Sequence, residues 1–209
     1  MTEAYKLTVT VLYKKLNEIG ELSLMSNILV VIGSARTGRV ADKVLDYVKA
    51  DIEGRDGVTA TVVDLAALNL PFYNNEQPAM SPDHVQTDEN VATWSKYVSE
   101  ADSVVFITPE YNHNLSAIQK NALDWLFSEW NDKPVTAVAY GWTGGSLAVA
   151  ALREVLTNVK AEIGQDMAQL GFMKDLNPDG SLLDAENVTA QIAAAIDEIV
   201  VPAGEPVTA

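Results

Sequence analysis

The chain has 209 residues, 48% of them hydrophobic, and its formal net charge at pH 7 is −15. This length is typical of a single α/β domain with a sizeable core. The negative charge disfavours nucleic-acid partners, because binding to a phosphate backbone requires clustered Lys and Arg side chains. The chain has no cysteine and only two histidines, so thiol catalysis is excluded and we expect no metal site.

No apolar run approaches the roughly 20 residues of a membrane-spanning helix, and no segment has the pattern of a signal peptide. We therefore expect a cytoplasmic protein that does not associate with a membrane. Residues 1–24 are interpreted as an N-terminal extension or leader that precedes the first strong strand. A short amphipathic helix is the alternative for this segment, since Val9, Leu12, Leu16 and Ile19 recur at helical spacing.

From residue 25 to residue 200, apolar strand patterns alternate with amphipathic helix patterns, and residues 201–209 are interpreted as a tail. Strands are predicted at 28–32, 59–65, 103–108 and 135–140, with a weaker one at 166–170. Helices are predicted at 40–52, 91–100, 146–158 and 185–200, and another begins after Ser116, which has capping-box spacing to Gln119. Residues 69–90 are predicted to form a long loop. This alternation predicts one domain with a doubly wound, five-stranded parallel sheet and helices on both faces.

The loop after the first predicted strand has the composition of an anion-binding site. It reads Gly33-Ser34-Ala35-Arg36-Thr37-Gly38-Arg39, and backbone N–H groups at a helix N-terminus favour phosphate. The P-loop pattern fails because Arg39 and Val40 stand where Lys and Ser or Thr belong, and the dinucleotide pattern fails at Ala35. A monophosphate site held by Ser34, Arg36 and Arg39 remains. Asp64, at the end of the second strand, is interpreted as a capping residue rather than a ribose ligand.

Two further loops lie at the carboxyl ends of predicted strands, where ligands bind in open α/β sheets. Residues 109–114 offer an aromatic ring, a carboxylate, two carboxamides and an imidazole, which together could hold a flat heteroaromatic ligand. Residues 141–145 are rich in glycine, which lets a ligand ring approach the backbone closely. On the helix between these loops, Lys120 and Asp124 have the spacing of an ion pair, and Trp125 is expected to pack or to form an interface.

Together these loops describe a flat ring with a monophosphate, which is the layout of flavin mononucleotide (FMN). The chain resembles the NAD(P)H-dependent FMN reductase family of flavodoxin-like proteins, which includes quinone, azo-dye and chromate reductases. Four segments carry the resemblance: IGSARTGR (32–39), DLAALNLPFYNNE (64–76), TPEYNHNLSAIQKNALDWL (108–126) and KPVTAVAYGWTGGSLAVAALREVL (133–156).

The resemblance implies a flavodoxin-like fold, FMN as cofactor and NAD(P)H as co-substrate. It implies a small-molecule electron acceptor: a quinone, free flavin, an azo compound or a metal oxyanion. It also implies a homodimer or homotetramer with residues 121–125 near the subunit contact. No side chain is expected to act as a general acid or base, because the flavin performs hydride transfer. The implied cofactor-binding residues are Ser34, Arg36, Arg39 and Val40 at the phosphate, Pro109, Glu110, Tyr111 and Asn112 along the ring, and Gly144 and Gly145 at its pyrimidine edge.

Tyr111, Phe72 and Tyr73 are expected to shape the acceptor pocket, although Phe72 and Tyr73 could instead anchor the long loop. A competing hypothesis is a flavodoxin-like, non-catalytic electron carrier, whose negative charge would suit docking on basic partners. Arg36 and Arg39 favour the enzyme, because carriers usually hold the phosphate with a hydroxyl-rich loop. A family member that has lost its flavin is the third possibility.

Overall fold

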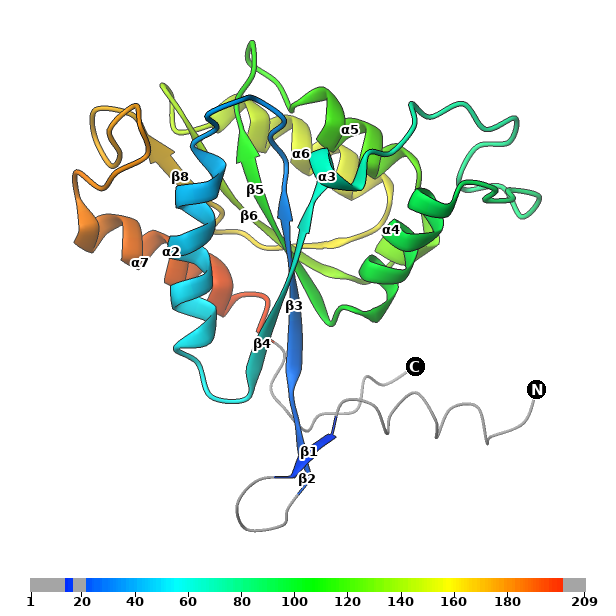
Figure 1. Cartoon of the computed structure of the whole chain (residues 1–209), viewed down its shortest axis with the longest axis horizontal. Coiled ribbons are helices and arrows are strands. Elements are labelled where there is room, and N and C mark those ends of the chain that lie inside the picture. The colour runs from blue at the N-terminus through cyan, green and yellow to red at the C-terminus, as the bar shows by residue number, and fades with distance from the viewer. Residues whose placement is uncertain (1–13, 17–21, 201–209) are drawn as a thin grey trace.

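The computed structural model of the protein describes residues 14–16 and 22–200. Its centre is a parallel sheet with the strand order β4-β3-β5-β6, followed by a last position that β7 and β8 share. Figure 1 shows β3, β5 and β6 in the middle of the molecule. The strands are Ser26–Ile32 (β3), Val58–Asp64 (β4), Ser103–Pro109 (β5), Pro134–Gly141 (β6), Glu162–Ile163 (β7) and Ala168–Gly171 (β8).

The last strand position is divided along its length. β7 pairs with Pro134 and Val135 at the start of β6, and β8 pairs with residues 138–141 at its end. The two short strands therefore act as one interrupted edge strand beside β6. With this edge counted once, the sheet has five positions, and the predicted doubly wound, five-stranded architecture is confirmed.

Helices cover both faces of the sheet because strand side chains point alternately to opposite sides. Val30 and Val105 pack toward α2 and α7, whereas Val31 and Phe106 pack toward the opposite helices. The two clusters of buried residues form separate halves of the core, one on each face. The helices are Ala41–Glu53 (α2) and Ala185–Asp197 (α7) on one face, and Glu89–Glu100 (α4), Ala117–Asp124 (α5) and Ser146–Asn158 (α6) on the other.

Several short elements were not predicted. A one-turn helix, Leu65–Leu68 (α3), follows β4, and a 3-10 turn, Ser128–Trp130 (η1), follows α5. Lys14–Leu16 (β1) pairs antiparallel with Leu22–Leu24 (β2), so a helix through Leu16 is wrong. The remaining positions of that hypothetical helix, Val9, Leu12 and Ile19, lie outside the described residues.

The predicted capping box at the start of α5 is only half formed. The Ser116 hydroxyl accepts a hydrogen bond from the Gln119 backbone N–H at 3.2 Å, which caps the helix. The Gln119 side chain does not return to Ser116, because its amide nitrogen donates to the Thr108 hydroxyl at 3.1 Å. Gln119 is fully buried and therefore ties α5 to the end of β5.

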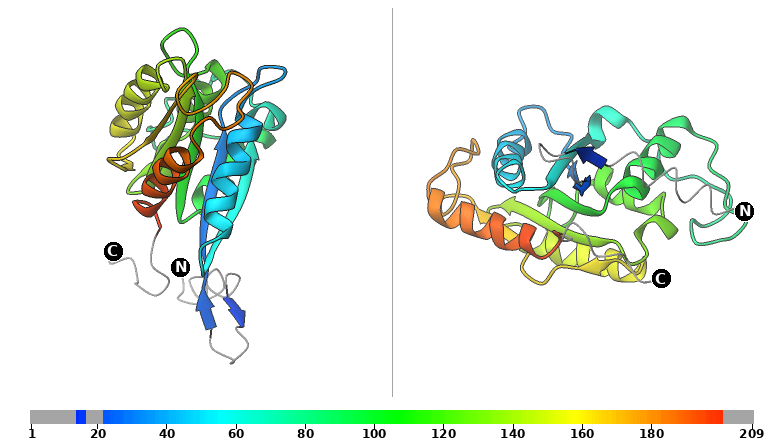
Figure 2. Two further views of the ribbon diagram at one scale, coloured as in Figure 1. Left: turned by 90° about the vertical axis from the view of Figure 1, so that its left-hand side faces the viewer. Right: turned by 90° about the horizontal axis from the view of Figure 1, so that it is seen from below.

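The strand ends determine where a ligand can bind. Because the strands are parallel, the loops that follow β3, β5 and β6 meet at one edge of the sheet, at the top of Figure 1. The β1–β2 pair lies at the other end of the molecule, which the turned views of Figure 2 also show. Among the described helices, none is both long and apolar enough to cross a membrane.

Candidate functional site

A cleft of about 500 Å³ lies at the carboxyl ends of β3, β5 and β6. Its volume falls in the range of small-molecule sites, roughly 300–1,000 Å³. Eight of the ten predicted cofactor-binding residues line it, and Gly144 and Gly145 do not. The lining residues are Ser34, Arg36, Gly38, Arg39, Val40, Pro109, Glu110, Tyr111, Asn112, His113, Tyr140, Gly141, Trp142, Thr143, Phe172 and Pro178.

At the start of the first loop, hydrogen bonds to neighbouring segments hold Gly33 and the buried Ser34 in place. Gly33 donates its N–H to the Ile107 carbonyl at 3.0 Å, and its own carbonyl accepts from the Ser116 hydroxyl. The Ser34 hydroxyl and the Tyr111 hydroxyl share a hydrogen bond of 2.5 Å. Each hydroxyl carries one proton. One of the two protons forms the hydrogen bond between the hydroxyls, so the other can be donated to a ligand.

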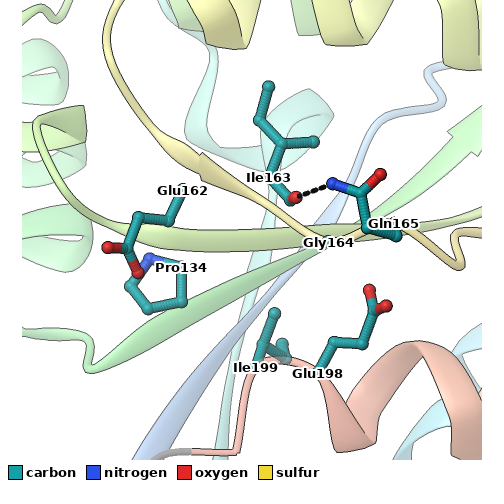
Figure 3. Close-up of a pocket in the computed structure, with 7 residues that line it drawn as sticks. All are labelled: Pro134, Glu162, Ile163, Gly164, Gln165, Glu198 and Ile199. Atoms are coloured by element: carbon teal, nitrogen blue, oxygen red, sulfur yellow. Dashed lines mark hydrogen bonds between the residues drawn. The ribbon is translucent and has the colours of Figure 1, made fainter.

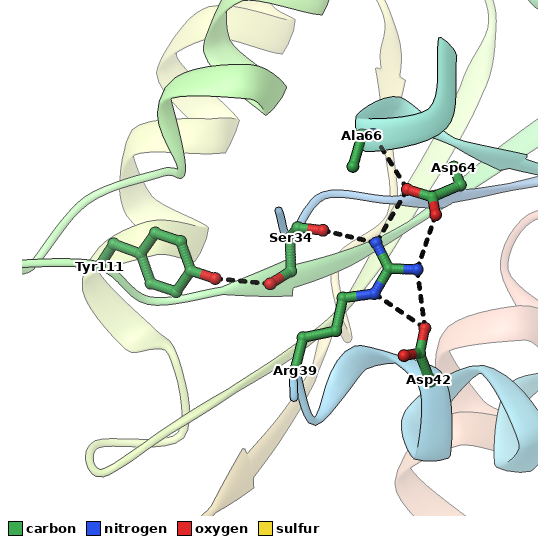
Figure 4. A network of polar contacts seen from close by, with 6 residues as sticks. All are labelled: Ser34, Arg39, Asp42, Asp64, Ala66 and Tyr111. Atoms are coloured by element: carbon green, nitrogen blue, oxygen red, sulfur yellow. Dashed lines mark hydrogen bonds and ion pairs between the residues drawn. The ribbon is translucent and has the colours of Figure 1, made fainter. Parts of the chain in front are cut away.

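The two arginines of the first loop have different surroundings. Arg36 is exposed, and it has no ion-pair partner within the part of the chain that the structure describes. Arg39 is enclosed by oxygen atoms (Figure 4): two of Asp64 at 2.8 and 2.6 Å, one of Asp42 at 2.8 Å, and the Ser34 carbonyl at 2.7 Å. The hydrogen bond to Asp64 raises the pKa of Arg39 and lowers the pKa of Asp64.

Asp64 has two structural roles at the end of β4. Its carboxylate accepts the Ala66 N–H at 2.9 Å and thereby caps α3, which confirms the capping role predicted for it. The same carboxylate holds Arg39 in a two-point ion pair. Both oxygens are therefore used within the protein, and neither faces a ribose.

The second loop turns sharply directly after β5. Tyr111 and Asn114 exchange backbone hydrogen bonds of 3.0 and 3.1 Å, and the two residues between them have positive φ angles. These are Asn112 (φ 49°) and His113 (φ 64°), which form the kind of turn in which asparagine is favoured. The turn explains why a polar Asn-His pair follows the strand, and it brings Tyr111 into the cleft wall.

Glu110 joins the second loop to the third. Its side chain is only 8% exposed, and its carboxylate accepts the Leu147 N–H and the Thr143 hydroxyl, each at 3.0 Å. Leu147 lies in the first turn of α6, where a carboxylate is stabilised by the free N–H groups of the helix. Glu110 is therefore occupied by holding the two walls of the cleft together.

The glycines of the third loop serve the turn itself. Gly144 and Gly145 have φ angles of +70° and +78°, which residues with a Cβ rarely adopt. A Cβ at Gly145 would lie 2.7 Å from the Ala139 Cβ, and one at Gly144 would lie 3.2 Å from the Gln169 carbonyl oxygen. Residues 141–143, rather than these glycines, face the cleft. Contact of Gly144 and Gly145 with a flavin stays a prediction.

Three aromatic residues of the cleft were not identified from the sequence. Trp142 is 72% exposed and meets the edge of Phe172 with ring centroids 5.5 Å apart. Phe172 also approaches Tyr140 at 6.2 Å. Burial raises the pKa of Tyr140, so its hydroxyl stays protonated. Trp142 could have been noticed as a large ring within a glycine-rich loop, whereas Phe172 lies in a segment without a recognisable pattern.

Phe72 and Tyr73 do not line the cleft. Asn121 donates to the Pro71 carbonyl at 2.8 Å and accepts the Tyr73 N–H at 2.8 Å. The Trp125 indole N–H donates to the same carbonyl at 2.9 Å, and its ring lies 5.0 Å from that of Tyr73. Tyr73 therefore anchors the long loop on α5, which was the alternative for it. Phe72 is 79% exposed.

Another pocket, of about 320 Å³, lies at the opposite end of β6 (Figure 3). Its charged side chains are two carboxylates, Glu162 and Glu198, and Glu198 accepts the Asp166 N–H at 3.1 and 3.2 Å. Two carboxylates repel a phosphate, so this pocket does not suit a nucleotide. The pocket is lined by Pro134, Glu162, Ile163, Gly164, Gln165, Glu198 and Ile199.

Comparison with known proteins assigns the family. The model of the NADPH-dependent FMN reductases matches residues 26–169, which include the whole sheet up to β8 and all three cleft loops. The chain belongs to the NADPH-dependent FMN reductase family. The resemblance inferred from the four sequence segments is therefore confirmed.

Individual relatives agree with this assignment. An NAD(P)H-dependent FMN reductase of Saccharomyces cerevisiae is 32% identical over 179 residues, which cover 81% of this chain and 91% of the relative. An NADPH azoreductase of a Bacillus species is 36% identical over 138 residues, 64% of this chain and 70% of the relative. Among solved structures, the flavoenzyme NAD(P)H:(acceptor) oxidoreductase of Paracoccus denitrificans superimposes with a TM-score of 0.65 at 26% identity, covering 84% of this chain and 97% of that one.

Membership of a reductase family confirms the predicted flavodoxin-like fold, the enzyme class, and FMN with NAD(P)H as cofactor and co-substrate. It also decides against a non-catalytic electron carrier. The cleft of this family member has what FMN requires: an exposed arginine and paired hydroxyls beside the start of α2, and aromatic side chains farther along. At Gly38 (φ +66°), no atom of the described residues lies within 4 Å of an added Cβ, so a ligand can approach the loop backbone there.

Proposed function

We propose that this FMN reductase transfers hydride from NAD(P)H through FMN to a quinone or a similar flat acceptor. The observation that carries the proposal is one continuous cleft, which joins an anion-binding helix N-terminus to an aromatic-lined slot. Bound there, FMN would supply the chemistry of hydride transfer between the nicotinamide and the acceptor. The protein supplies binding, orientation and electrostatics.

Phosphate binding is assigned to the first loop. Arg36 provides the positive charge, because it is the arginine of the cleft that has no carboxylate partner among the described residues. The hydroxyl pair of Ser34 and Tyr111 provides one further donor. The N-terminus of α2, which begins at Ala41, adds backbone N–H groups and a favourable dipole.

Ring binding is assigned to the second and third loops. Residues 109–112 and residues 141–143 both line the cleft, and we assign one wall of the ring site to each. Glu110 sets the separation of the walls through its bonds to Leu147 and Thr143. It thereby orients the ring without exchanging a proton with substrate. Trp142 and Phe172, whose rings meet edge to face, offer a surface on which an aromatic acceptor can stack.

The acceptor is proposed by analogy with relatives. They include a quinone reductase of Pseudomonas putida and the Bacillus azoreductase, both named for flat, conjugated substrates. A slot with an exposed indole at its mouth favours the same class of acceptor here. The homodimer or homotetramer and the cytoplasmic location stay predictions, and light scattering on the purified full chain would establish the oligomeric state.

Titration of the full chain with FMN, followed by flavin fluorescence, tests cofactor binding. Steady-state oxidation of NADH and NADPH with a benzoquinone tests turnover on the loaded protein. We expect FMN binding, and quinone-dependent oxidation of at least one nicotinamide. Arg36→Gln should weaken FMN binding about tenfold or more, because a bond to a charged group contributes about 1.5–3 kcal/mol. A chain that binds no FMN, or that turns over neither nicotinamide, would contradict the proposal.

A further inference from the structure

The Arg39 side chain already makes several contacts with protein oxygens, unlike a side chain that is free to bind a ligand. Its side chain is 15% exposed, and its three nitrogens make five contacts with protein oxygens between 2.6 and 2.8 Å. Two contacts go to Asp64, two to Asp42 and one to the Ser34 carbonyl. Figure 4 shows the guanidinium enclosed by these groups.

A guanidinium group has five N–H donors and no acceptor. All three Arg39 nitrogens are engaged, and two carboxylates offset the single positive charge. A phosphate could reach this guanidinium only by displacing one of these oxygens: the Asp42 carboxylate, the Ser34 carbonyl or the two-point Asp64 pair, which is among the strongest polar contacts in proteins. Arg36 offers the same group, and no carboxylate of residues 14–16 or 22–200 pairs with it.

The contacts of Arg39 connect three segments of chain that border the first loop. Ser34 lies directly after β3, Asp64 ends β4 and Asp42 lies in the first turn of α2. In a trans peptide the carbonyl and the following N–H point in opposite directions. Holding the Ser34 carbonyl on Arg39 therefore turns the Ala35 N–H to the opposite side and fixes the orientation of this backbone donor.

We infer that Arg39 is a positioning residue, which holds the phosphate loop through Ser34 and Asp64 and does not bind the phosphate itself. The inference rests on the proposed function, because the loop binds phosphate only if FMN occupies the cleft. It replaces the sequence-based hypothesis in which Arg36 and Arg39 share the phosphate.

Asp64→Asn separates the two roles by the sign of its effect. The substitution removes one negative charge and keeps an oxygen that can cap α3. If Arg39 binds the phosphate, freeing it from Asp64 tightens FMN binding. If Arg39 holds the loop, losing the two-point pair loosens the loop, and the dissociation constant for FMN rises about tenfold, the equivalent of one charge-assisted contact.

Arg39→Lys provides a second and independent test. Lysine keeps the positive charge but lacks the planar fork that reaches Asp64 and the Ser34 carbonyl together. A loop-holding role predicts a loss of FMN affinity close to that of Arg39→Gln. It also predicts that Asp64→Asn adds little to Arg39→Gln in the double variant. A phosphate-binding role predicts that lysine retains affinity to within a few-fold.

Riboflavin, which lacks the phosphate, shows whether the effect is local. The full chain and each variant are titrated with FMN and with riboflavin, and thermal unfolding is recorded. We expect Arg39→Lys and Asp64→Asn to lower the ratio of FMN affinity to riboflavin affinity about tenfold. A fall in the unfolding temperature with an unchanged ratio would show a purely structural residue and would overturn the inference.

Arg55→Lys is the matched control. Arg55 follows the other end of α2, and its side chain is 21% exposed. It contacts Asp51 at 2.8 Å, Asp197 at 2.5 Å and the Ala193 carbonyl at 3.2 Å. This variant should lower the unfolding temperature and leave the affinity ratio unchanged. No FMN binding by the wild-type chain would refute the proposed function, whereas tighter binding by Asp64→Asn would refute the role of Arg39 alone.

Discussion

Replacing Glu110 with glutamine tests whether this residue holds the cleft walls together or takes part in chemistry. The carboxylate is 8% exposed and accepts two hydrogen bonds of 3.0 Å, from the Leu147 N–H and the Thr143 hydroxyl. Glutamine has nearly the same shape but only one oxygen. Its oxygen can accept the Leu147 N–H while its NH₂ group donates to the Thr143 hydroxyl, which can also accept. Both contacts can therefore persist, but each loses the contribution of the negative charge.

The magnitude follows from these two bonds. A hydrogen bond to a charged group contributes about 1.5–3 kcal/mol to the free energy of unfolding. Glu110→Gln replaces two such bonds with neutral bonds of about 0.5–1.5 kcal/mol each, so the free energy of unfolding should fall by about 2–3 kcal/mol. For a domain of this size, 1 kcal/mol corresponds to about 2–4 °C, so the unfolding temperature should fall by about 4–12 °C. Thr143→Val removes the hydroxyl bond alone and should cost about 1.5 kcal/mol, the lower end of the range for a bond to a charged group, because Thr143 is exposed and water can take the place of its hydroxyl.

The assay combines thermal unfolding, followed by circular dichroism, with steady-state quinone reduction at saturating FMN. Because Glu110 holds the loops and transfers no proton, kcat per bound flavin should fall by less than about tenfold, below the 10²–10⁴ that a general acid or base supplies. An unfolding temperature equal to that of the wild type, together with a kcat loss of a hundredfold or more, would refute this reasoning.

Three further predictions use the same assays. Trp142→Ala removes a 72% exposed ring that meets Phe172 edge to face, so the unfolding temperature should fall by only about 1–6 °C. It should raise KM for an aromatic quinone by about 2–12-fold, the value of one aromatic pair, and Trp142→Phe should restore KM. Equal KM values for all three proteins would contradict stacking at the cleft mouth. Gly145→Ala combines a positive φ with a Cβ contact of 2.7 Å, whereas at Gly38 no atom of the described residues lies within 4 Å of an added Cβ. Gly38→Ala should lower the free energy of unfolding by about 1–2 kcal/mol, and Gly145→Ala should lower it further. Equal losses would show that the close contact at Gly145 relaxes freely. The hydrogen bond from Arg39 lowers the pKa of Asp64 in the folded protein. The contribution of this ion pair to the free energy of unfolding should therefore be complete above about pH 4 and be lost as the pH falls through the lower folded-state pKa. The unfolding temperatures of wild type and Asp64→Asn should differ at pH 7 and converge in acid, and a difference that does not change with pH would contradict this.

The sheet could be predicted because its central strands are buried on both faces. Continuous apolar runs such as 28–32 and 104–107 leave no alternative periodicity, and polar loops separate them from amphipathic helices. The elements that escaped prediction include α3, η1 and β7, which have four, three and two residues. Such lengths are too short to show a period, and contacts with the rest of the fold determine them.

The cleft was predictable as a set of loops because parallel strands bring their carboxyl ends to one edge. Individual roles within it were not. Arg36 and Arg39 are equivalent in composition, and only the folded chain places Asp64, 25 residues away, against one of them. Glycine at positions 144 and 145 is compatible either with a close ligand contact or with a positive φ angle. Only the backbone of the folded chain shows that both positions have positive φ angles. Phe172 reaches the site from a segment that carries no local signal.

Three polar contacts in the cleft are made between groups of the protein itself. They join Arg39 to Asp64, Ser34 to Tyr111 and Glu110 to Leu147. Walls braced in this way hold their shape without a ligand, so little conformational entropy is lost when a nucleotide enters. Departure of the nucleotide likewise leaves a receptive surface that needs no refolding. Such preorganisation leaves the affinity for FMN to be set mainly by the contacts that the nucleotide itself makes.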